Sequence, residues 1–279
     1  MKYQELYRYG TEKLREAEIA EAELDARLLL EFICHTDRNT LLAHGDMEVS
    51  AEQEENYVNL IGKRSKHIPL QHLTGEQDFM GLSFRVNEHV LIPRQDTEIL
   101  VEEAMRELHD GMELLDMCTG SGCILLSLLH YSNDCHGMGV DISPEALQVA
   151  GENAKALSLG ADFIQSDLFE ALDKDRKFDL LVSNPPYIPS GIIQTLMPEV
   201  REYEPLGALD GREDGLYFYR RISREAKPYL QGGAWLFFEI GCDQAEAVCG
   251  ILEADGYREI EVVKDFAGLD RVVKCIFQK

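Results

Sequence analysis

The sequence predicts an α/β fold with a mainly parallel, doubly wound sheet, preceded by a small helical region. Before about residue 75 the apolar residues follow a helical period only, whereas after about residue 96 strand-like runs alternate with helical stretches. The last two strand-like runs are separated only by residues 265–270, too few for a parallel crossover, so they should pair antiparallel. We therefore expect a helical domain over residues 1–75, a linker over residues 76–95 and the main domain over residues 96–279.

The N-terminal region shows three helical patterns, over residues 3–19, 21–34 and 50–67. The third pattern opens with a capping box formed by Ser50 and Gln53, and Pro69 should end it. Residues 79–92 then alternate around two turn signals, as a hairpin linker does. We interpret the helical domain as one that helps to bind a protein substrate; the alternative is a structural cap on the larger domain.

The main domain should contain seven strands. They cover residues 113–118, 136–141, 162–166, 178–183, 233–240, 257–264 and 271–277. Helices fall between them, and one begins at Ser143 with Pro144 at its first position and Glu145 next, which is typical of a helix N-terminus. In such a fold, ligands bind outside the carboxyl ends of the strands.

A glycine turn follows the first of these strands. Thr119-Gly120-Ser121-Gly122 leads directly into an apolar helical run. The two glycines would let the backbone turn tightly and approach a ligand, and the helix N-terminus favours an anion such as a carboxylate. Asp141 ends the next strand, nineteen residues after Gly122, where an acid binds ribose hydroxyls in dinucleotide-type folds.

The sequence favours a nucleoside ligand without phosphates. The position three after Gly122 is Leu125, which argues against a pyrophosphate site. S-adenosylmethionine fits better, since its carboxylate could meet the glycine turn and its ribose Asp141. Asp167, followed by Leu168, could accept from the adenine amino group; the alternative for Asp167 is a solvated strand end. The residues that we expect to bind this cofactor are Cys118, Thr119, Gly120, Ser121, Gly122, Asp141, Asp167, Leu168 and Asn184.

Asn184-Pro185-Pro186-Tyr187 follows the fourth predicted strand and supplies the expected catalytic residues. The Asn184 side-chain oxygen and the Pro185 carbonyl are both acceptors, so together they can hold the two N–H bonds of a planar NH2 group. The nitrogen is then aimed at an electrophile, and Tyr187 would stack on a flat amide. The alternative is that these residues only form an ordinary loop at the end of the strand.

With both motifs in place, the chain resembles the HemK/PrmC family of peptide chain release factor N5-glutamine methyltransferases over nearly its whole length. The segments that carry the resemblance are residues 71–75, 81–84, 90–94, 96–98, 119–123, 141–143, 182–189, 203–205, 214–216, 239–241 and 270–273. The resemblance implies a seven-stranded, Rossmann-like class I S-adenosylmethionine-dependent methyltransferase, with residues 96–279 as its catalytic domain. It also implies the substrate, which is the glutamine of the Gly-Gly-Gln motif of class 1 release factors, and a role in translation termination.

The chain departs from the family pattern at three places. Gln95 stands where a second proline is more frequent, Cys118 where a glycine commonly opens the turn, and Gly211-Arg212 where a glycine pair is usual. None of these changes removes a group that the chemistry needs.

Charge helps to choose the substrate class. With 27 basic and 51 acidic residues the formal net charge is −24, which repels a polyanion and suits a basic protein partner. We therefore expect no direct nucleic-acid substrate. Two rival functions stay open: an amino-methyltransferase acting on adenine N6 or guanine N2, which the Asn184 motif permits, and a scaffold that binds the cofactor without catalysis.

The remaining composition suits an enzyme of the cytoplasm. The apolar runs are shorter than a membrane span, and the first residues do not read as a signal peptide. The seven cysteines show neither a Cys-x-x-Cys pair nor zinc-ligand spacing with histidine, so we expect reduced thiols and no metal.

Overall fold

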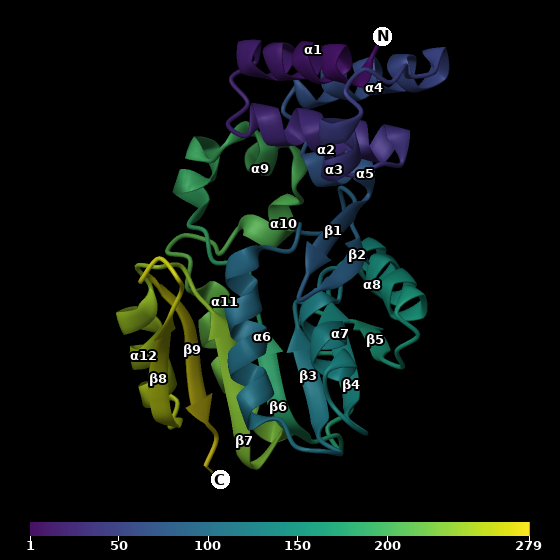
Figure 1. Ribbon diagram of the computed structural model, residues 1–279. Helices are drawn as coiled ribbons and strands as arrows, with labels where there is room; N and C mark the ends of the chain where they lie inside the picture. Colours follow the sequence, from purple (N-terminus) through teal and green to yellow (C-terminus); the bar gives the residue numbers. More distant parts are fainter. Residues whose placement is uncertain (279) are drawn as a thin grey trace. The chain divides into compact units, whose positions relative to one another are not determined.

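The computed structural model describes residues 1–278, and the chain divides into two compact units (Figure 1). The first, the helical unit, contains Met1–Glu76 together with the short segment Met197–Tyr203. The second, the sheet unit, contains Gln77–Leu196 and Glu204–Lys279.

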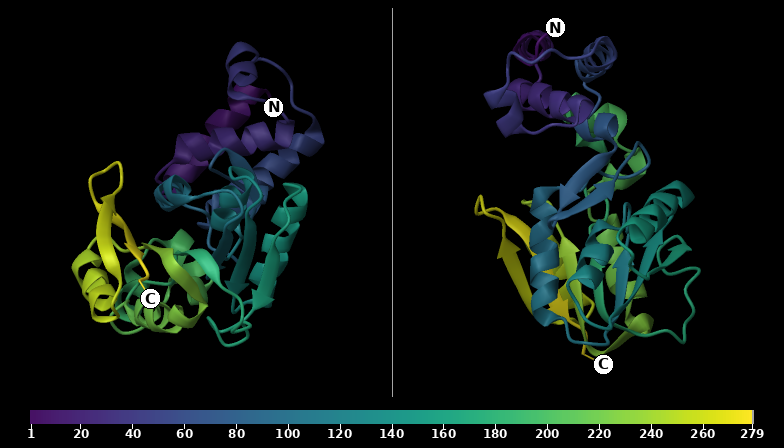
Figure 2. Two further views of the ribbon diagram at one scale, coloured as in Figure 1. Left: turned by 90° about the horizontal axis from the view of Figure 1, so that it is seen from below. Right: turned by 45° about the vertical axis from the view of Figure 1, so that its right-hand side comes forward.

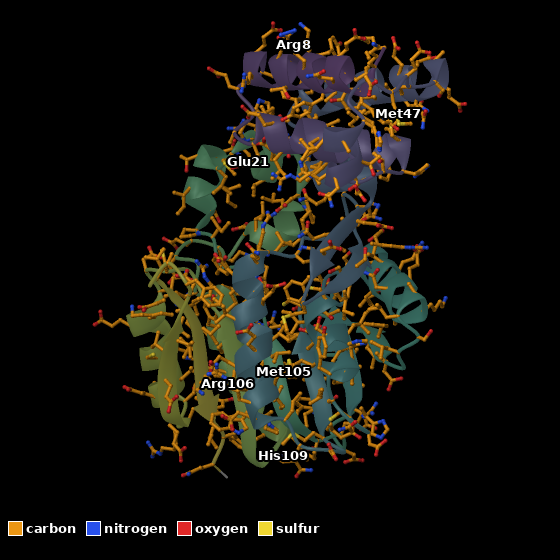
Figure 3. The ribbon with its side chains drawn as sticks, viewed as in Figure 1. Arg8, Glu21, Met47, Met105, Arg106 and His109 are labelled. Atoms are coloured by element: carbon orange, nitrogen blue, oxygen red, sulfur yellow. The ribbon has the colours of Figure 1, made fainter. Side chains whose placement is uncertain are left out.

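The helical unit is built from α1 (Tyr3–Glu16), α2 (Ala22–Cys34), α3 (Arg38–Ala43), α4 (Ala51–Arg64), α5 (Leu70–Thr74) and α9 (Pro198–Tyr203). Apolar residues of α1, α2 and α4 form its core, with Leu6, Leu29 and Tyr57 fully buried. Polar residues take the outer faces; Arg8 of α1, for example, points away from the core (Figure 3). Burial of these apolar stripes stabilises helices that are too short to be stable alone.

The predicted capping box of α4 is confirmed, because the Ser50 hydroxyl accepts from the Gln53 amide and the Gln53 side chain accepts from the Ser50 amide. The end of this helix differs from the prediction. It stops at Arg64, and His67 has a left-handed backbone at φ 64°. Pro69 instead precedes the short helix α5, where its fixed φ suits a helix start.

The linker contains the hairpin of β1 (Glu76–Phe79) and β2 (Leu82–Arg85). The hairpin is shorter than the 79–92 pattern indicated, and residues 86–92 form irregular chain. Val86 and Val90 of this irregular stretch are buried in a small cluster with Ala146 and Val149. Apolar alternation therefore marked buried positions there rather than a strand.

All seven predicted strands of the main sheet are present. They are β3 (Glu113–Met117), β4 (His136–Asp141), β5 (Asp162–Gln165), β6 (Phe178–Ser183), β7 (Leu230–Glu239), β8 (Arg258–Lys264) and β9 (Asp270–Ile276). Their order is β5-β4-β3-β6-β7-β9-β8, and the first five in this order run parallel. As predicted, β8 and β9 pair antiparallel, and β9 also runs antiparallel to β7.

Helices cover both faces of this sheet (Figures 1 and 2). One core cluster joins the strands to α6 (Gln95–Glu107), α7 (Cys123–His130) and the end of α8 (Pro144–Ala156). The opposite cluster contains residues of α11 (Tyr217–Glu225) and α12 (Ala245–Ala254). The predicted start of α8 is confirmed, since the Ser143 hydroxyl accepts from the Ala146 amide and Pro144 is the first helical residue.

The chain between β6 and β7 is irregular apart from short helices. In the sheet unit these are η1 (Ser190–Thr195), α10 (Leu206–Leu209), η2 (Lys227–Tyr229) and the longer α11. The strand order reverses between β3 and β6, and in doubly wound sheets such a switch point opens a crevice for ligands. Among residues 1–278, no helix combines the length and the apolar character needed to cross a bilayer.

Candidate active site

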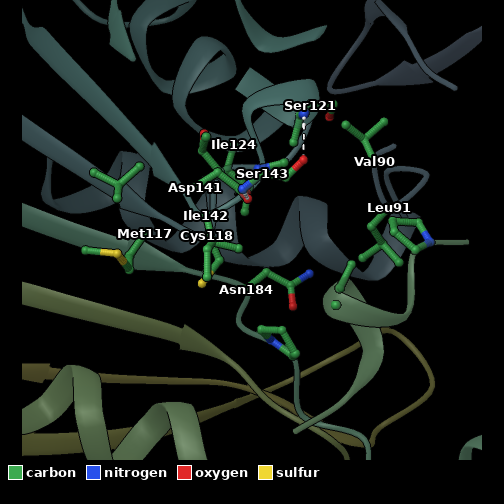
Figure 4. Close-up of a pocket in the computed structure, with 18 of the residues that line it drawn as sticks. Val90, Leu91, Met117, Cys118, Ser121, Ile124, Asp141, Ile142, Ser143 and Asn184 are labelled. Atoms are coloured by element: carbon green, nitrogen blue, oxygen red, sulfur yellow. Dashed lines mark hydrogen bonds between the residues drawn. The ribbon is translucent and has the colours of Figure 1, made fainter. Parts of the chain in front are cut away.

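A cavity of about 340 Å³ opens at the carboxyl ends of β3, β4 and β6. It gathers most of the residues that the sequence singled out, namely Cys118, Thr119, Gly120, Ser121, Asp141, Asp167, Leu168, Asn184 and Pro186. Asp141, Cys118 and Asn184 are seen around it in Figure 4. Gly122, Pro185 and Tyr187 do not line it.

The glycine turn is held by its own strand and by β4. The Thr119 hydroxyl donates to the buried Asp116 carboxylate at 2.6 Å, and the Thr119 amide donates to the Val140 carbonyl at 3.0 Å. Burial raises the pKa of Asp116 to about 7. Gly122 has φ 79°, and a Cβ there would lie 3.2 Å from the Ala150 Cβ, so its role is close packing at the start of α7.

Asp141 presents a carboxylate to the cavity. One oxygen accepts from the Gly120 amide at 2.9 Å and the other from the Ser143 amide at 3.0 Å. Burial raises the pKa of this carboxyl, and the backbone donors lower it. Each carboxylate oxygen has a second lone pair, so the group can still accept from a pair of ligand hydroxyls.

Asp167 also lines the cavity, but its side chain has a protein partner. An oxygen of its carboxylate accepts from the Arg221 guanidinium of α11 at 2.7 Å. Leu168 follows with a left-handed φ of 51° and is buried. The ion pair links the chain after β5 to α11, a connection that no local pattern in the sequence indicates.

Asn184 lies at the end of β6, and its side chain donates to the Thr97 hydroxyl at 3.4 Å. Hydrogen bonds from other segments hold the backbone of the residues that follow it. The Tyr187 carbonyl accepts from Gln244 at 2.9 Å, and the Gly211 amide donates to the Ile188 carbonyl at 2.8 Å. A Cβ on Gly211 would lie 2.7 Å from the Tyr187 carbonyl carbon, so only glycine lets the two backbones approach this closely.

The Tyr187 side chain points to the protein interior, where its hydroxyl donates to Glu239 at 3.4 Å. Burial raises the pKa of Tyr187, and the Glu239 charge raises it further. Glu239 itself is buried at the end of β7, and burial raises its pKa to about 7. The hydroxyl end of Tyr187 is therefore fixed by the protein.

Four polar residues near the cavity had no role in the sequence-based prediction: Arg94, Thr97, Glu204 and Glu239. Arg94 and Thr97 line the cavity, and Arg94 donates to the almost fully buried Glu204 carboxylate at 2.5 Å. Burial raises the pKa of Glu204, and Arg94 lowers it. All four lie in segments that carry the family resemblance, which was the only available signal for them. Within residues 1–278, no group of three or more potential ligand side chains could hold a metal ion.

The chain matches two family models. Residues 5–75 match the PrmC N-terminal domain, and residues 108–228 match a methyltransferase domain. The release factor glutamine methyltransferase of Clostridium acetobutylicum is 42% identical over 257 residues, which cover 90% of this chain and 90% of that protein. This chain belongs to the release factor glutamine methyltransferase family.

Further relatives agree with that assignment. The release factor glutamine methyltransferase of Geobacter sulfurreducens is 42% identical over 260 residues, covering 93% of this chain and 91% of that protein. A crystal structure of a methyltransferase from Pyrococcus furiosus has a TM-score of 0.54 at 15% identity, covering 71% of this chain and 90% of that one. The latter similarity concerns the fold alone, and it agrees with the Rossmann-like methyltransferase sheet described above.

Proposed function

We propose that this protein transfers a methyl group from S-adenosylmethionine to the side-chain amide nitrogen, N5, of the glutamine in the Gly-Gly-Gln motif of class 1 release factors. The observation that carries the proposal is the position of Asn184-Pro185-Pro186-Tyr187 at the end of β6, beside a cavity that also contains Asp141 and the glycine turn. Membership of the release factor glutamine methyltransferase family supports it. We place its action in the cytoplasm, where release factors work.

The cavity fits the proposed cofactor. Gly120 and Ser121 would lie against the methionine part at the N-terminus of α7, and Asp141 would accept from the ribose hydroxyls. Leu168 offers an apolar surface for adenine, with Asp167 at the edge of the same wall. When bound, S-adenosylmethionine supplies an electrophilic methyl group on a positively charged sulfur.

The protein's own contribution is to position a weak nucleophile. An amide nitrogen reacts poorly because its lone pair is delocalised into the carbonyl. In our proposal the Asn184 side-chain oxygen and the Pro185 carbonyl accept the two N–H bonds and hold the nitrogen in line with the methyl group. The same acceptors stabilise the positive charge that develops on the nitrogen. In this transfer the N–C bond would form as the S–C bond to the methyl group breaks, and the nitrogen would lose its extra proton to water. No base is needed beforehand, since that proton becomes acidic only as the N–C bond forms.

Methyl transfer from radiolabelled S-adenosylmethionine tests this function. Four methyl acceptors are compared: a purified class 1 release factor, the same factor with its motif glutamine replaced by alanine, ribosomal RNA and DNA. We expect label on the intact factor alone. Label on nucleic acid would instead identify a nucleobase amino-methyltransferase, and cofactor binding without any label would identify a scaffold.

The variant Asn184→Ala tests the proposed catalytic role. Loss of a group that acts on the transition state should lower kcat by roughly 100-fold or more. Calorimetric titration with S-adenosylmethionine should give an affinity close to that of the wild type, because the glycine turn and Asp141 are intact. Turnover equal to that of the wild type would refute the role of Asn184.

A further inference from the structure

The side chain of Asn153 joins two segments at the cavity that are separate in the sequence. Asn153 lies near the end of α8 and is only 1% exposed. Its NH2 group donates to the Ser121 carbonyl of the glycine turn at 2.9 Å and to the Arg85 carbonyl at the end of β2 at 3.1 Å. Its side-chain oxygen accepts from the Arg85 amide at 2.7 Å. One buried side chain therefore holds the backbone of both segments.

The irregular segment that follows Arg85 forms one wall of the cavity. We call residues 86–94 the linker wall, and those of its residues that line the cavity are His89, Val90, Leu91, Pro93 and Arg94. Figure 4 shows Val90 and Leu91 of this wall together with Ser121 of the glycine turn. The linker wall contains no helix or strand, so its position depends on the contacts that its side chains and its ends make.

The linker wall is held at three places along its length. Asn153 holds Arg85, directly before the wall, through two hydrogen bonds. Val86 and Val90 are buried against residues of α8. Arg94, the last residue of the wall, donates to a buried carboxylate. The first two of these contacts are both made by α8, so this helix sets where the wall begins.

The same face of α8 supports the glycine turn. A Cβ on Gly122 would lie 3.2 Å from the Ala150 Cβ, so the turn packs closely on this helix. Ala146, Ala150 and Asn153 follow one another at steps of four and three residues, which places them on one helix face. Ala146 itself lines the cavity. Helix α8 is thus a common support for the glycine turn and the linker wall.

A primary amide suits the position of Asn153. Its three hydrogen bonds need one acceptor and two N–H donors on a single planar group, and asparagine provides both. An aspartate could still accept from the Arg85 amide, but its second oxygen would face two carbonyl oxygens. The same contacts fix the orientation of the Asn153 amide, because a flipped amide would set its NH2 group against the Arg85 N–H and its oxygen against the two carbonyls.

We propose that Asn153 is a positioning residue that fixes the glycine turn and the linker wall around the methionine part of S-adenosylmethionine. This inference rests on the proposed function, in which Gly120 and Ser121 lie against that part of the cofactor. Asn153 does not line the cavity, so it acts only through the backbone that it holds. Without it, the ligand itself would have to order both segments, and this ordering lowers the affinity.

The test compares two ligands by calorimetric titration. S-adenosylhomocysteine contains the amino-acid part of the cofactor, whereas 5′-methylthioadenosine has the same nucleoside and a thioether without that part. In Asn153→Leu we expect the affinity for S-adenosylhomocysteine to fall about tenfold or more, and the affinity for 5′-methylthioadenosine to change by less than about threefold. Asn153→Asp keeps the size of the side chain without the N–H donors and should show the same pattern. A loss caused by partial unfolding would weaken both ligands by the same factor.

Tyr257→Phe is the matched control. Tyr257 is buried in the core cluster that contains residues of α11 and α12, and its hydroxyl donates to the Ser223 carbonyl at 2.9 Å. This change also removes a buried hydrogen bond to a main-chain carbonyl, but on the other face of the sheet. The affinities for both ligands should equal those of the wild type.

Amide hydrogen exchange in the wild type gives a test that needs no variant. The Arg85 amide donates to Asn153, and Arg85 does not line the cavity. At saturation, S-adenosylhomocysteine should slow the exchange of this amide more than 5′-methylthioadenosine does, because only the former orders the turn that Asn153 also holds. The Tyr257 amide, which donates to the Leu252 carbonyl, is the control and should respond equally to the two ligands.

The outcomes separate this inference from the proposed function. Wild-type protein that binds neither ligand would overturn the proposed cofactor and the inference with it. Wild-type binding together with an unchanged affinity for S-adenosylhomocysteine in both Asn153 variants, or with an equal loss of both ligands, would overturn only the role of Asn153. If neither variant folds, the exchange of the Arg85 amide decides, and an equal response to the two ligands would refute the inference.

Discussion

Two residues near the candidate active site have backbone conformations that glycine adopts more easily. Cys118 opens the glycine turn at φ 65°, and Arg212 follows Gly211 at φ 71°. These are two of the three positions at which the sequence departs from the family pattern, and in both the left-handed backbone is present without the glycine. Each costs about 1–2 kcal/mol relative to glycine. The surrounding contacts must therefore impose the geometry on these two residues.

Asp116 gives a prediction at this scale because it is a buried carboxyl with a pKa of about 7. In the unfolded chain an aspartate loses its proton near pH 3.9, so between about pH 4 and about pH 7 the folded protein binds more protons than the unfolded one. The stabilisation from this group is thus complete below pH 4 and is lost as the pH rises through 7. The variant Asp116→Asn has no carboxyl proton to lose, so this pH-dependent loss of stability is absent from it.

Urea unfolding of Asp116→Asn and wild type over this range measures the effect. The variant should gain stability relative to the wild type as the pH rises from 4 to 8, by about 2–4 kcal/mol in total. Asp46→Asn, at an exposed position, serves as the control and should show a nearly constant difference. A constant difference for Asp116→Asn as well would contradict the raised pKa.

The candidate residues that lie in local motifs are the ones that could be named from the sequence. Cys118 to Ser121, Asp141 and Asn184 follow directly from strand ends and turns, and the fold gathers them around one cavity. Thr97, Glu204 and Glu239 could not be found in this way, because each becomes important only through a partner that is distant in sequence. No local sequence pattern identifies a carboxylate that is buried against a residue distant in the chain.

At the scale of elements, the short helix α9 belongs to the helical unit although it lies between β6 and β7 in the chain. Arg64 of α4 explains this. Its guanidinium donates to Asp25 of α2 at 2.7 Å and to Glu199 of α9 at 3.1 Å, and His67 also contacts Glu199 at 3.1 Å. Tyr203 completes the attachment by donating to the Lys66 carbonyl.

Arg64→Ala should destabilise the helical unit strongly. The Asp25 and Arg64 side chains are less than 10% exposed, and removal of the cation leaves the Asp25 charge buried without its partner. Breaking such a buried pair costs about 3–5 kcal/mol, which urea unfolding would detect. Arg8→Ala is the matched control, because Arg8 pairs with Glu12 on the exposed side of α1 and should contribute little (Figure 3). Equal effects of the two changes would refute the importance of the buried cluster.

The elements themselves were predictable where their patterns are long. The seven strands and several longer helices, among them α1, α2, α4 and α8, were predicted because burial on a sheet or a helix face imposes a clear period, whereas α6 was not predicted. The short helices α3, α5 and α9 were missed, because five or six residues show barely one turn of periodicity. The return of α9 to the helical unit depends on Arg64, more than a hundred residues earlier in the chain.

At the scale of the whole molecule, the net charge of −24 dominates encounter with other molecules. Such a charge attracts basic partners, and added salt shortens the range of this electrostatic attraction. In the proposed function the partner is a release factor, and attraction would raise the rate of encounter more than the rate of the chemical step.

We therefore expect kcat/KM for a release factor to fall by about tenfold when NaCl is raised from about 0.1 M to about 0.5 M, with kcat nearly constant. Steady-state methylation at several salt concentrations measures this. A short peptide that carries the Gly-Gly-Gln sequence without basic residues is the control and should respond weakly. An equal response of factor and peptide would show that long-range charge is unimportant.

The position of residues 197–203 has a consequence for how this protein can evolve. The chain passes from one unit to the other at residues 76–77, 196–197 and 203–204. A single recombination point near residue 76 would thus exchange most of the helical unit but leave behind Glu199, whose partner Arg64 would come from another lineage. The helical unit is therefore poorly suited to domain shuffling. Its N-terminal helices and the segment after β6 should have been inherited together and changed together.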